Sequence, residues 1–115
     1  MNDDPTDRNA IDAPTFAELE ASAGADFARE LIGTFLEEAP TMLADLRSAL
    51  AAGNAERFRR AAHSLKSNAN TFGALALGAL ARELELKGLS GAAPLALIEQ
   101  EYARAAAALT ALRDA

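Results

Sequence analysis

Apolar side chains recur every three or four residues along most of this chain of 115 residues. That spacing matches the turn of an α-helix, about 3.6 residues, so each run of such residues forms one apolar stripe on a helix. The longest stripe begins near Ala25, ends near Ala52 and continues through Pro40; it contains Ala28, Ile32, Leu36, Ala39, Leu43, Leu46 and Leu50. We expect one long helix with a kink at Pro40, a break there being the alternative.

Turn and capping residues divide the rest of the chain into further helices. Thr15 followed by Glu18 fits a capping box at a helix start. Gly53 and Asn54 form a turn and an N-cap, and Gly73 supplies the next turn. The remaining helices are therefore expected over about 16–22, 55–72 and 74–87, and from Pro94 nearly to the C-terminus.

The longer helices each have one apolar stripe and are joined by short connections, so neighbours should pack antiparallel. Half of the residues are hydrophobic but only 5% are aromatic, which favours close-packed helices over sheets. The predicted fold is all-α, an antiparallel up-and-down four-helix bundle with a short additional N-terminal capping helix. Residues 1–13 are rich in Asp and poor in apolar residues and are expected to form a flexible tail, and residues 14–115 the bundle domain.

Composition excludes several classes of function. The chain has no cysteine and one histidine, so thiolate, zinc and di-iron sites lack ligands. A net charge of −6 argues against nucleic-acid binding. No apolar run approaches the roughly 18 residues of a membrane span, and the first residues lack the basic region and apolar run typical of a signal peptide. We expect a cytoplasmic monomer with no bound cofactor or metal and no membrane contact.

The single histidine, His63, lies opposite the apolar stripe of its helix. At about 100° per residue, the core-facing side of residues 55–72 holds Phe58, Ala61, Leu65, Ala69 and Phe72. His63 should therefore point to solvent. The same exposed arc holds Glu56, Arg59, Arg60, Lys66, Ser67 and Asn70, which gathers positive charge around the histidine of an acidic protein.

Imidazole can act as a nucleophile because its neutral form is populated near physiological pH. Lys66, one turn from His63, is placed to contact the oxygens of a phosphoryl group on the ring, and Ser67 is small enough to leave room above it. An exposed histidine is more often a solvated side chain, and paired arginines are more often part of a solvated face. No orienting carboxylate for the histidine is recognisable in the sequence.

Three segments carry a resemblance to a known family: Ala62-His63-Ser64-Leu65-Lys66-Ser67, then Phe72-Gly73-Ala74-Leu75, then Leu80-Ala81-Arg82-Glu83-Leu84-Glu85. Together they resemble the histidine-containing phosphotransfer (HPt) domain, and the flanking helices agree with that family's bundle. The resemblance implies that His63 is the phosphoacceptor and Lys66 assists the phosphoryl group. It also implies a small residue at Ser67 and a structural turn glycine at Gly73. Ala81 stands where many relatives have cysteine.

The resemblance also implies partners and a reaction. Receiver domains of response regulators, and a hybrid histidine kinase, are the expected partners, with Mg²⁺ in the receiver's acidic pocket. The positive patch around His63 complements such a pocket. The chain has no glycine-rich nucleotide loop, so it should be a phosphocarrier without kinase activity of its own.

Two questions stay open at the level of sequence. A helical adaptor that docks receiver or kinase domains without carrying phosphate is the alternative function. The docking surface is also uncertain: Phe35 and Met42 either join the core or leave an apolar patch, and we expect Met42 to be exposed. Without that patch, docking would fall to Arg59, Arg60 and Asn70.

Overall fold

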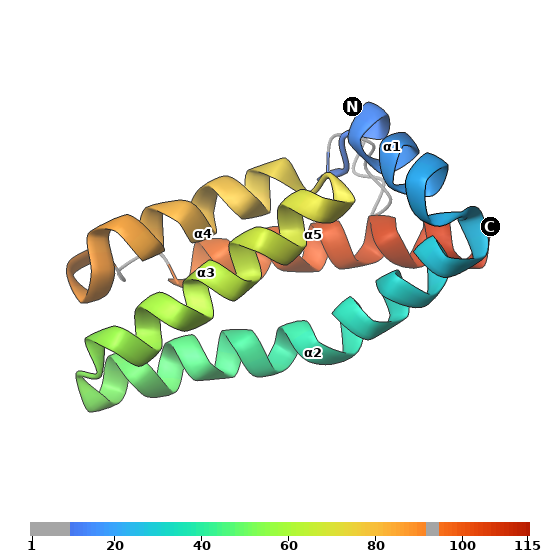
Figure 1. Cartoon of the computed structure of the whole chain (residues 1–115). Coiled ribbons are helices and arrows are strands. Elements are labelled where there is room, and N and C mark those ends of the chain that lie inside the picture. Colours follow the sequence, from blue (N-terminus) through green and yellow to red (C-terminus); the bar gives the residue numbers. More distant parts are fainter. Residues whose placement is uncertain (1–9, 92–94) are drawn as a thin grey trace, which may run out of the picture.

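The helices pack as an antiparallel bundle in the computed structural model, which describes residues 10–91 and 95–115. The elements are α1 (Ala13–Ala23), α2 (Ala25–Ala52), α3 (Ala55–Phe72), α4 (Leu75–Lys87), the short 3-10 helix η2 (Gly88–Gly91) and α5 (Leu95–Asp114). In Figure 1 the four long helices run side by side in alternating directions, and α1 lies at the end where α2 begins. No strand occurs in the described ranges. The predicted all-α bundle with an additional N-terminal helix is confirmed.

Helix α2 continues through its internal proline. Pro40 has no N–H to donate to the carbonyl one turn earlier, and its ring pushes that carbonyl away, which bends a helix without having to end it. α2 is a single helix over Ala25–Ala52, and Figure 1 shows it bending part-way along its length. The prediction of one kinked helix is confirmed, and a break at Pro40 does not occur.

Two glycines end α2 and α3 where the sequence predicts. Gly53 and Gly73 have left-handed backbones, with φ of 67° and 87°. The residue after each glycine donates its N–H to a carbonyl five residues earlier, at 2.9 Å and 2.8 Å, which satisfies carbonyls that the helix end leaves free. Asn54 then caps α3 by accepting the backbone N–H of Arg57 at 3.1 Å. The expected start of the last helix at Pro94 lies outside the described residues.

The first helix begins three residues earlier than predicted. Its N-cap is Asp12, whose carboxylate accepts the backbone N–H of Thr15 at 3.2 Å. Thr15 is inside α1, and its hydroxyl donates to the same carboxylate. Asp caps as well as Thr does, and Pro14 suits the first turn of a helix because its missing N–H has no helical partner there. The prediction of Thr15 as the cap is therefore wrong.

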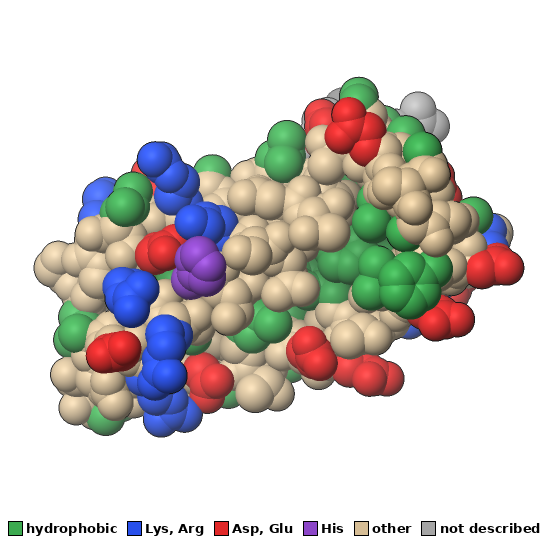
Figure 2. Space-filling view, in the orientation of Figure 1, with side chains coloured by type: hydrophobic (Ala, Val, Ile, Leu, Met, Phe, Trp, Pro, Cys, Tyr) green, Lys and Arg blue, Asp and Glu red, His purple; other side chains and the backbone are tan. Residues whose placement is uncertain are grey.

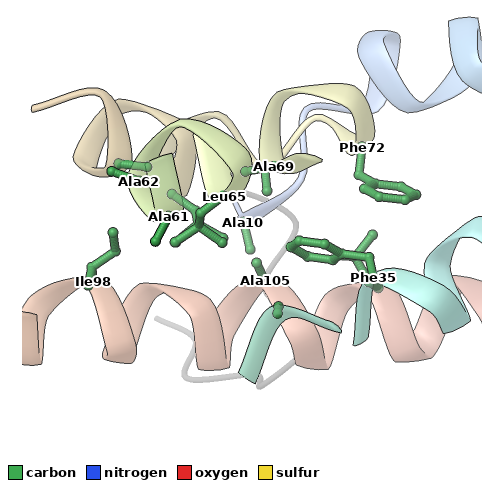
Figure 3. Packing of buried hydrophobic residues seen from close by; sticks show 14 of the residues in the cluster. Ala10, Phe35, Ala61, Ala62, Leu65, Ala69, Phe72, Ile98 and Ala105 are labelled. Carbon is green, nitrogen blue, oxygen red and sulfur yellow. The ribbon is translucent and has the colours of Figure 1, made fainter. Parts of the chain in front are cut away.

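The predicted tail of residues 1–13 is wrong for residues 10–13, while residues 1–9 lie outside the described part of the chain. Ala10 and Ile11 are only 1% and 7% exposed. Figure 3 shows Ala10 close to Leu65 and Ala105, between α3 and α5. The backbone N–H of Asp12 also donates to the carbonyl of Gly73 at 2.7 Å. Ala10 and Ile11 are therefore part of the hydrophobic core, and the segment is not a tail.

Gly73→Ala should destabilise the protein by about 2 kcal/mol, because a Cβ there combines a left-handed φ with a clash. That Cβ would lie 2.8 Å from the carbonyl oxygen of Asp12, whereas one at Gly53 or Gly33 would meet nothing within 4 Å. Gly53→Ala should then cost about 1 kcal/mol from its φ alone, and Gly33→Ala, inside α2, should be neutral or stabilising. Urea denaturation measures all three, and equal losses at Gly73 and Gly53 would contradict a role for the Asp12 contact.

Candidate functional site

His63 lies in the middle of α3 with 56% of its side chain exposed. The opposite face of the helix is buried in the core, through Phe58, Ala61, Leu65, Ala69 and Phe72. Because these residues fix the rotation of α3, the histidine is directed away from the core. The prediction that His63 faces solvent is confirmed.

A carboxylate from the neighbouring helix holds the imidazole ring. Oε2 of Glu85, on α4, lies 2.8 Å from Nδ1 of His63. Glu85 follows directly on the buried Leu84, and its own side chain is only 16% exposed. An ionised carboxylate can only accept, so Nδ1 of the neutral ring is the donor and the lone pair lies on Nε2.

The register between α3 and α4 explains why Glu85 meets His63. A Cβ at Gly78 would lie 2.1 Å from Oδ1 of Asn70, so the two helices approach closely where that side chain is missing. Asn70 follows His63 by two helical turns, and Gly78 precedes Glu85 by the same step. On antiparallel helices, the register that places Asn70 against Gly78 therefore places His63 against Glu85.

Lys66 contacts the other oxygen of the same carboxylate. Its Nζ lies 2.8 Å from Oε1 of Glu85, and its side chain is 25% exposed. The approach is not aligned as a hydrogen bond, so we treat the contact as an ion pair. Lys66 first, and His63 second, hold the pKa of Glu85 below its ordinary value, although partial burial acts in the opposite direction. His63, Glu85 and Lys66 together form what we call the site triad.

The other residues predicted near His63 lie on the same surface. Arg59, Arg60, Ser67 and Asn70 are all exposed. Arg59 has a distant ion pair, 3.9 Å, to the preceding turn of its own helix, and Asn70 packs on Gly78. In Figure 2 several Lys and Arg side chains surround the histidine, whereas Asp and Glu predominate on the half of this face that carries α1.

The structure separates the two apolar residues that were considered for docking: Phe35 joins the core and Met42 is half-buried. Phe35 is buried, 2% exposed, with its ring centroid 5.3 Å from that of Phe72 and 6.1 Å from that of Tyr102. Figure 3 shows Phe35 and Phe72 facing each other inside the bundle. Met42 is half-buried and packs against the core. A docking role for Met42 stays a prediction, and Phe35 cannot contribute to an exposed patch.

Sequence reasoning missed Glu85, the residue that binds the histidine ring. A projection of one helix shows which side chains share a face of α3, but it says nothing about which residue of α4 lies opposite. The feature of the sequence that could have indicated this role is the position of Glu85 at the end of the Leu80–Glu85 motif. Glu85 is thus an orienting carboxylate that was not recognisable in the sequence.

Neither a membrane-spanning helix nor a cluster of metal ligands occurs in the described residues. None of their helices has both the length and the apolar character needed to cross a bilayer. In the same part of the chain, no three His, Asp or Glu side chains are grouped closely enough to hold a metal ion.

Comparisons with known proteins identify the family. A model of the Hpt domain matches residues 30–115. The chain belongs to the Hpt domain family. It is also similar to the crystal structure of histidine-containing phosphotransfer protein B (HptB) from Pseudomonas aeruginosa PAO1, with a TM-score of 0.74, 30% sequence identity, and coverage of 91% of this chain and 92% of that one. No curated protein sequence matched the chain. As an Hpt domain, the chain is a histidine phosphotransfer module of phosphorelay signalling.

Glu85→Ala should remove the preference for a proton on Nδ1 of His63, because the carboxylate that accepts it is lost. Nitrogen-15 NMR of the ring at about pH 8.5, where imidazole is neutral, measures this directly, and a chain with one histidine needs no assignment of that signal. Glu83→Ala, an exposed position on the same helix, is the control and should change nothing. An unchanged tautomer in Glu85→Ala would show that the contact does not orient the ring.

Proposed function

We propose that His63 is the phosphoacceptor of this Hpt domain and that it exchanges a phosphoryl group with aspartates of receiver domains. The observation that carries the proposal is the bond between Nδ1 and Glu85 on a half-exposed ring. It leaves the lone pair on Nε2, and no side chain in the described ranges bonds to that atom. A nucleophilic nitrogen is thus available to a partner.

In the proposed transfer step, His63 and Glu85 of this chain act on a phosphoryl group that the receiver supplies. The lone pair of Nε2 attacks the phosphorus of an aspartyl phosphate, and the N–P bond forms as the P–O bond to the aspartate breaks. The aspartate leaves as a carboxylate with the electron pair of that bond. The ring gains a positive charge, which the carboxylate of Glu85 offsets through Nδ1–H. Return of the phosphoryl group to a receiver reverses each change.

Lys66 has two roles in this proposal. In the unphosphorylated protein its ammonium group pairs with Glu85 and holds the carboxylate beside the ring. When His63 carries a phosphoryl group, the added negative charge lies one helical turn away from Lys66, within reach of a flexible side chain. The ammonium group then neutralises part of the charge on the phosphoryl oxygens. Ser67, small and exposed, leaves space for the partner's active site.

The wider role follows from the family. The protein is a phosphocarrier, and we propose that it has no kinase activity of its own and that the Mg²⁺ needed for transfer is held by the receiver. We further propose a cytoplasmic monomer whose partners are response-regulator receiver domains and a hybrid histidine kinase. Arg59, Arg60, Asn70 and Met42 are the proposed contact residues around His63.

An adaptor that only docks receivers is the alternative, and one experiment separates the two. The protein is incubated with a phosphorylated receiver and Mg²⁺, and any transferred label is tested for lability in acid. Acid-labile label on this chain supports phosphotransfer. Acid-stable label, or no transfer from several receivers, supports the adaptor.

His63→Gln should abolish transfer and leave the fold intact. The side chain is exposed, so the free energy of unfolding should change by about 0.5 kcal/mol or less. Phosphotransfer assays and urea denaturation measure the two effects, with Ser64→Ala, at the exposed neighbouring position, as the control. Full phosphorylation of His63→Gln would contradict the assignment of His63 as the phosphoacceptor.

Lys66→Ala should slow transfer by about tenfold or more, because charge on the phosphoryl oxygens loses its counter-ion. Lys87→Ala removes the same charge from an exposed residue that pairs with Glu83 and should have little effect. The slowing should exceed that of Glu85→Ala if Lys66 contacts the phosphoryl group. If Lys66→Ala and Glu85→Ala are equally slow, Lys66 acts only by positioning Glu85. If Lys66→Ala transfers at the wild-type rate at both low and high salt, Lys66 has no role in transfer.

A further inference from the structure

Nearly every Lys and Arg side chain in the described ranges already has an acidic partner. The paired residues are Arg29, Arg47, Arg57, Arg59, Lys66, Lys87, Arg104 and Arg113. Within the same ranges, Arg60 and Arg82 have no ion pair, and both are exposed. These two guanidinium groups are therefore available to another molecule without the loss of an internal contact.

Both free arginines flank the site triad. Arg60 precedes His63 by about one turn, on the side of α3 that faces α2, as the ion pair between Arg57 and Asp45 of α2 shows. Arg82 precedes Glu85 by about one turn of α4, and the antiparallel register places it level with Lys66. Arg60 thus lies on the side of His63 that faces α2, and Arg82 lies on the other side, on α4.

The charge of the rest of the molecule makes this arrangement selective. With a net charge of −6, the protein repels an acidic partner in most orientations. The Lys and Arg side chains around the histidine attract it, as Figure 2 illustrates for one face. Such a field raises association rates and selects the approach that leads to reaction. Guanidinium groups also bind carboxylates through two parallel hydrogen bonds.

We propose that Arg60 and Arg82 form a two-point docking pair that binds carboxylates on both sides of the partner's reacting aspartate, an inference that rests on the proposed function of His63. The partner is an acidic protein surface with carboxylates flanking its phosphorylated residue. The arginines act before the chemical step, by orienting the partner, and touch neither the phosphoryl group nor the imidazole ring.

Transfer from preloaded protein tests the pair. Phosphoramidate phosphorylates imidazole without a protein partner, so it loads His63 in every variant. Transfer is then followed to a receiver domain that accepts phosphate from the wild-type protein. Arg60→Glu and Arg82→Glu should each slow transfer by about tenfold at low salt, with a larger loss in the double variant, while phosphoramidate loading stays within about twofold. The salt dependence of transfer should weaken in both variants.

Loading by phosphoramidate tests His63 as the phosphoacceptor, and transfer to the receiver tests the docking pair. Failure of phosphoramidate to load the wild-type protein would contradict His63 as phosphoacceptor, whereas normal loading with unchanged transfer in the variants would overturn the docking pair alone. Arg29→Glu is the matched control, because it makes the same charge change in the first turns of α2, at an exposed residue paired with Asp26. If Arg29→Glu slows transfer as much as Arg60→Glu and Arg82→Glu do, the slowing is an effect of net charge and the docking pair is contradicted.

A soluble competitor checks the chemistry of the partner. A polyglutamate peptide should inhibit transfer by the wild-type protein and lose that effect on the double variant. A short DNA duplex offers phosphates in place of carboxylates and carries a denser negative charge, so the net charge of −6 should repel it more strongly than the peptide and it should inhibit less. Inhibition by DNA equal to that by polyglutamate would show a general polyanion surface and overturn the assignment to an acidic protein.

Discussion

The close approach of α3 and α4 at Gly78 is the constraint on which the site depends. The amide of Asn70 occupies the space where a side chain at Gly78 would lie, and this contact helps to fix how the helices are aligned along their length. A shift of one turn would place Ala81 or Leu89 opposite His63, and neither side chain can accept a hydrogen bond. The hydrogen bond that orients the His63 ring thus depends on a contact two helical turns away, at the smallest residue of α4.

The charges around Glu85 keep its carboxylate ionised, and so able to bind the His63 ring, over the pH range in which the protein is expected to work. Lys66 and His63 lower the pKa of Glu85, so the carboxylate favours the folded state when it is ionised. That contribution is complete above the ordinary pKa of a glutamate and is lost only as the pH falls through the lowered value. Near neutral pH, Glu85 remains an acceptor for Nδ1.

Much of the fold could be predicted because its signals are local. Gly53 and Gly73 end helices at the expected positions, and the apolar stripe of α3 gives the direction of His63. Glu85 could not be predicted as the ring's partner, because that contact depends on the alignment of two helices and no single-helix pattern contains it. The same applies to the ion pair between Lys66 and Glu85, which also joins two helices. Asp12 and Thr15 were both acceptable caps, and tertiary packing chose between them.

The N-terminal segment contributes to the hydrophobic core but lies outside the part of the chain that the family model matches. The family model begins at residue 30, so it includes the whole site triad but neither α1 nor the segment before it. Ala10, Ile11 and Phe16 nevertheless lie in the core, and Asp12 is bonded to the turn between α3 and α4. A fragment cut at the family boundary would contain the whole site triad and leave one end of its hydrophobic interior open to water.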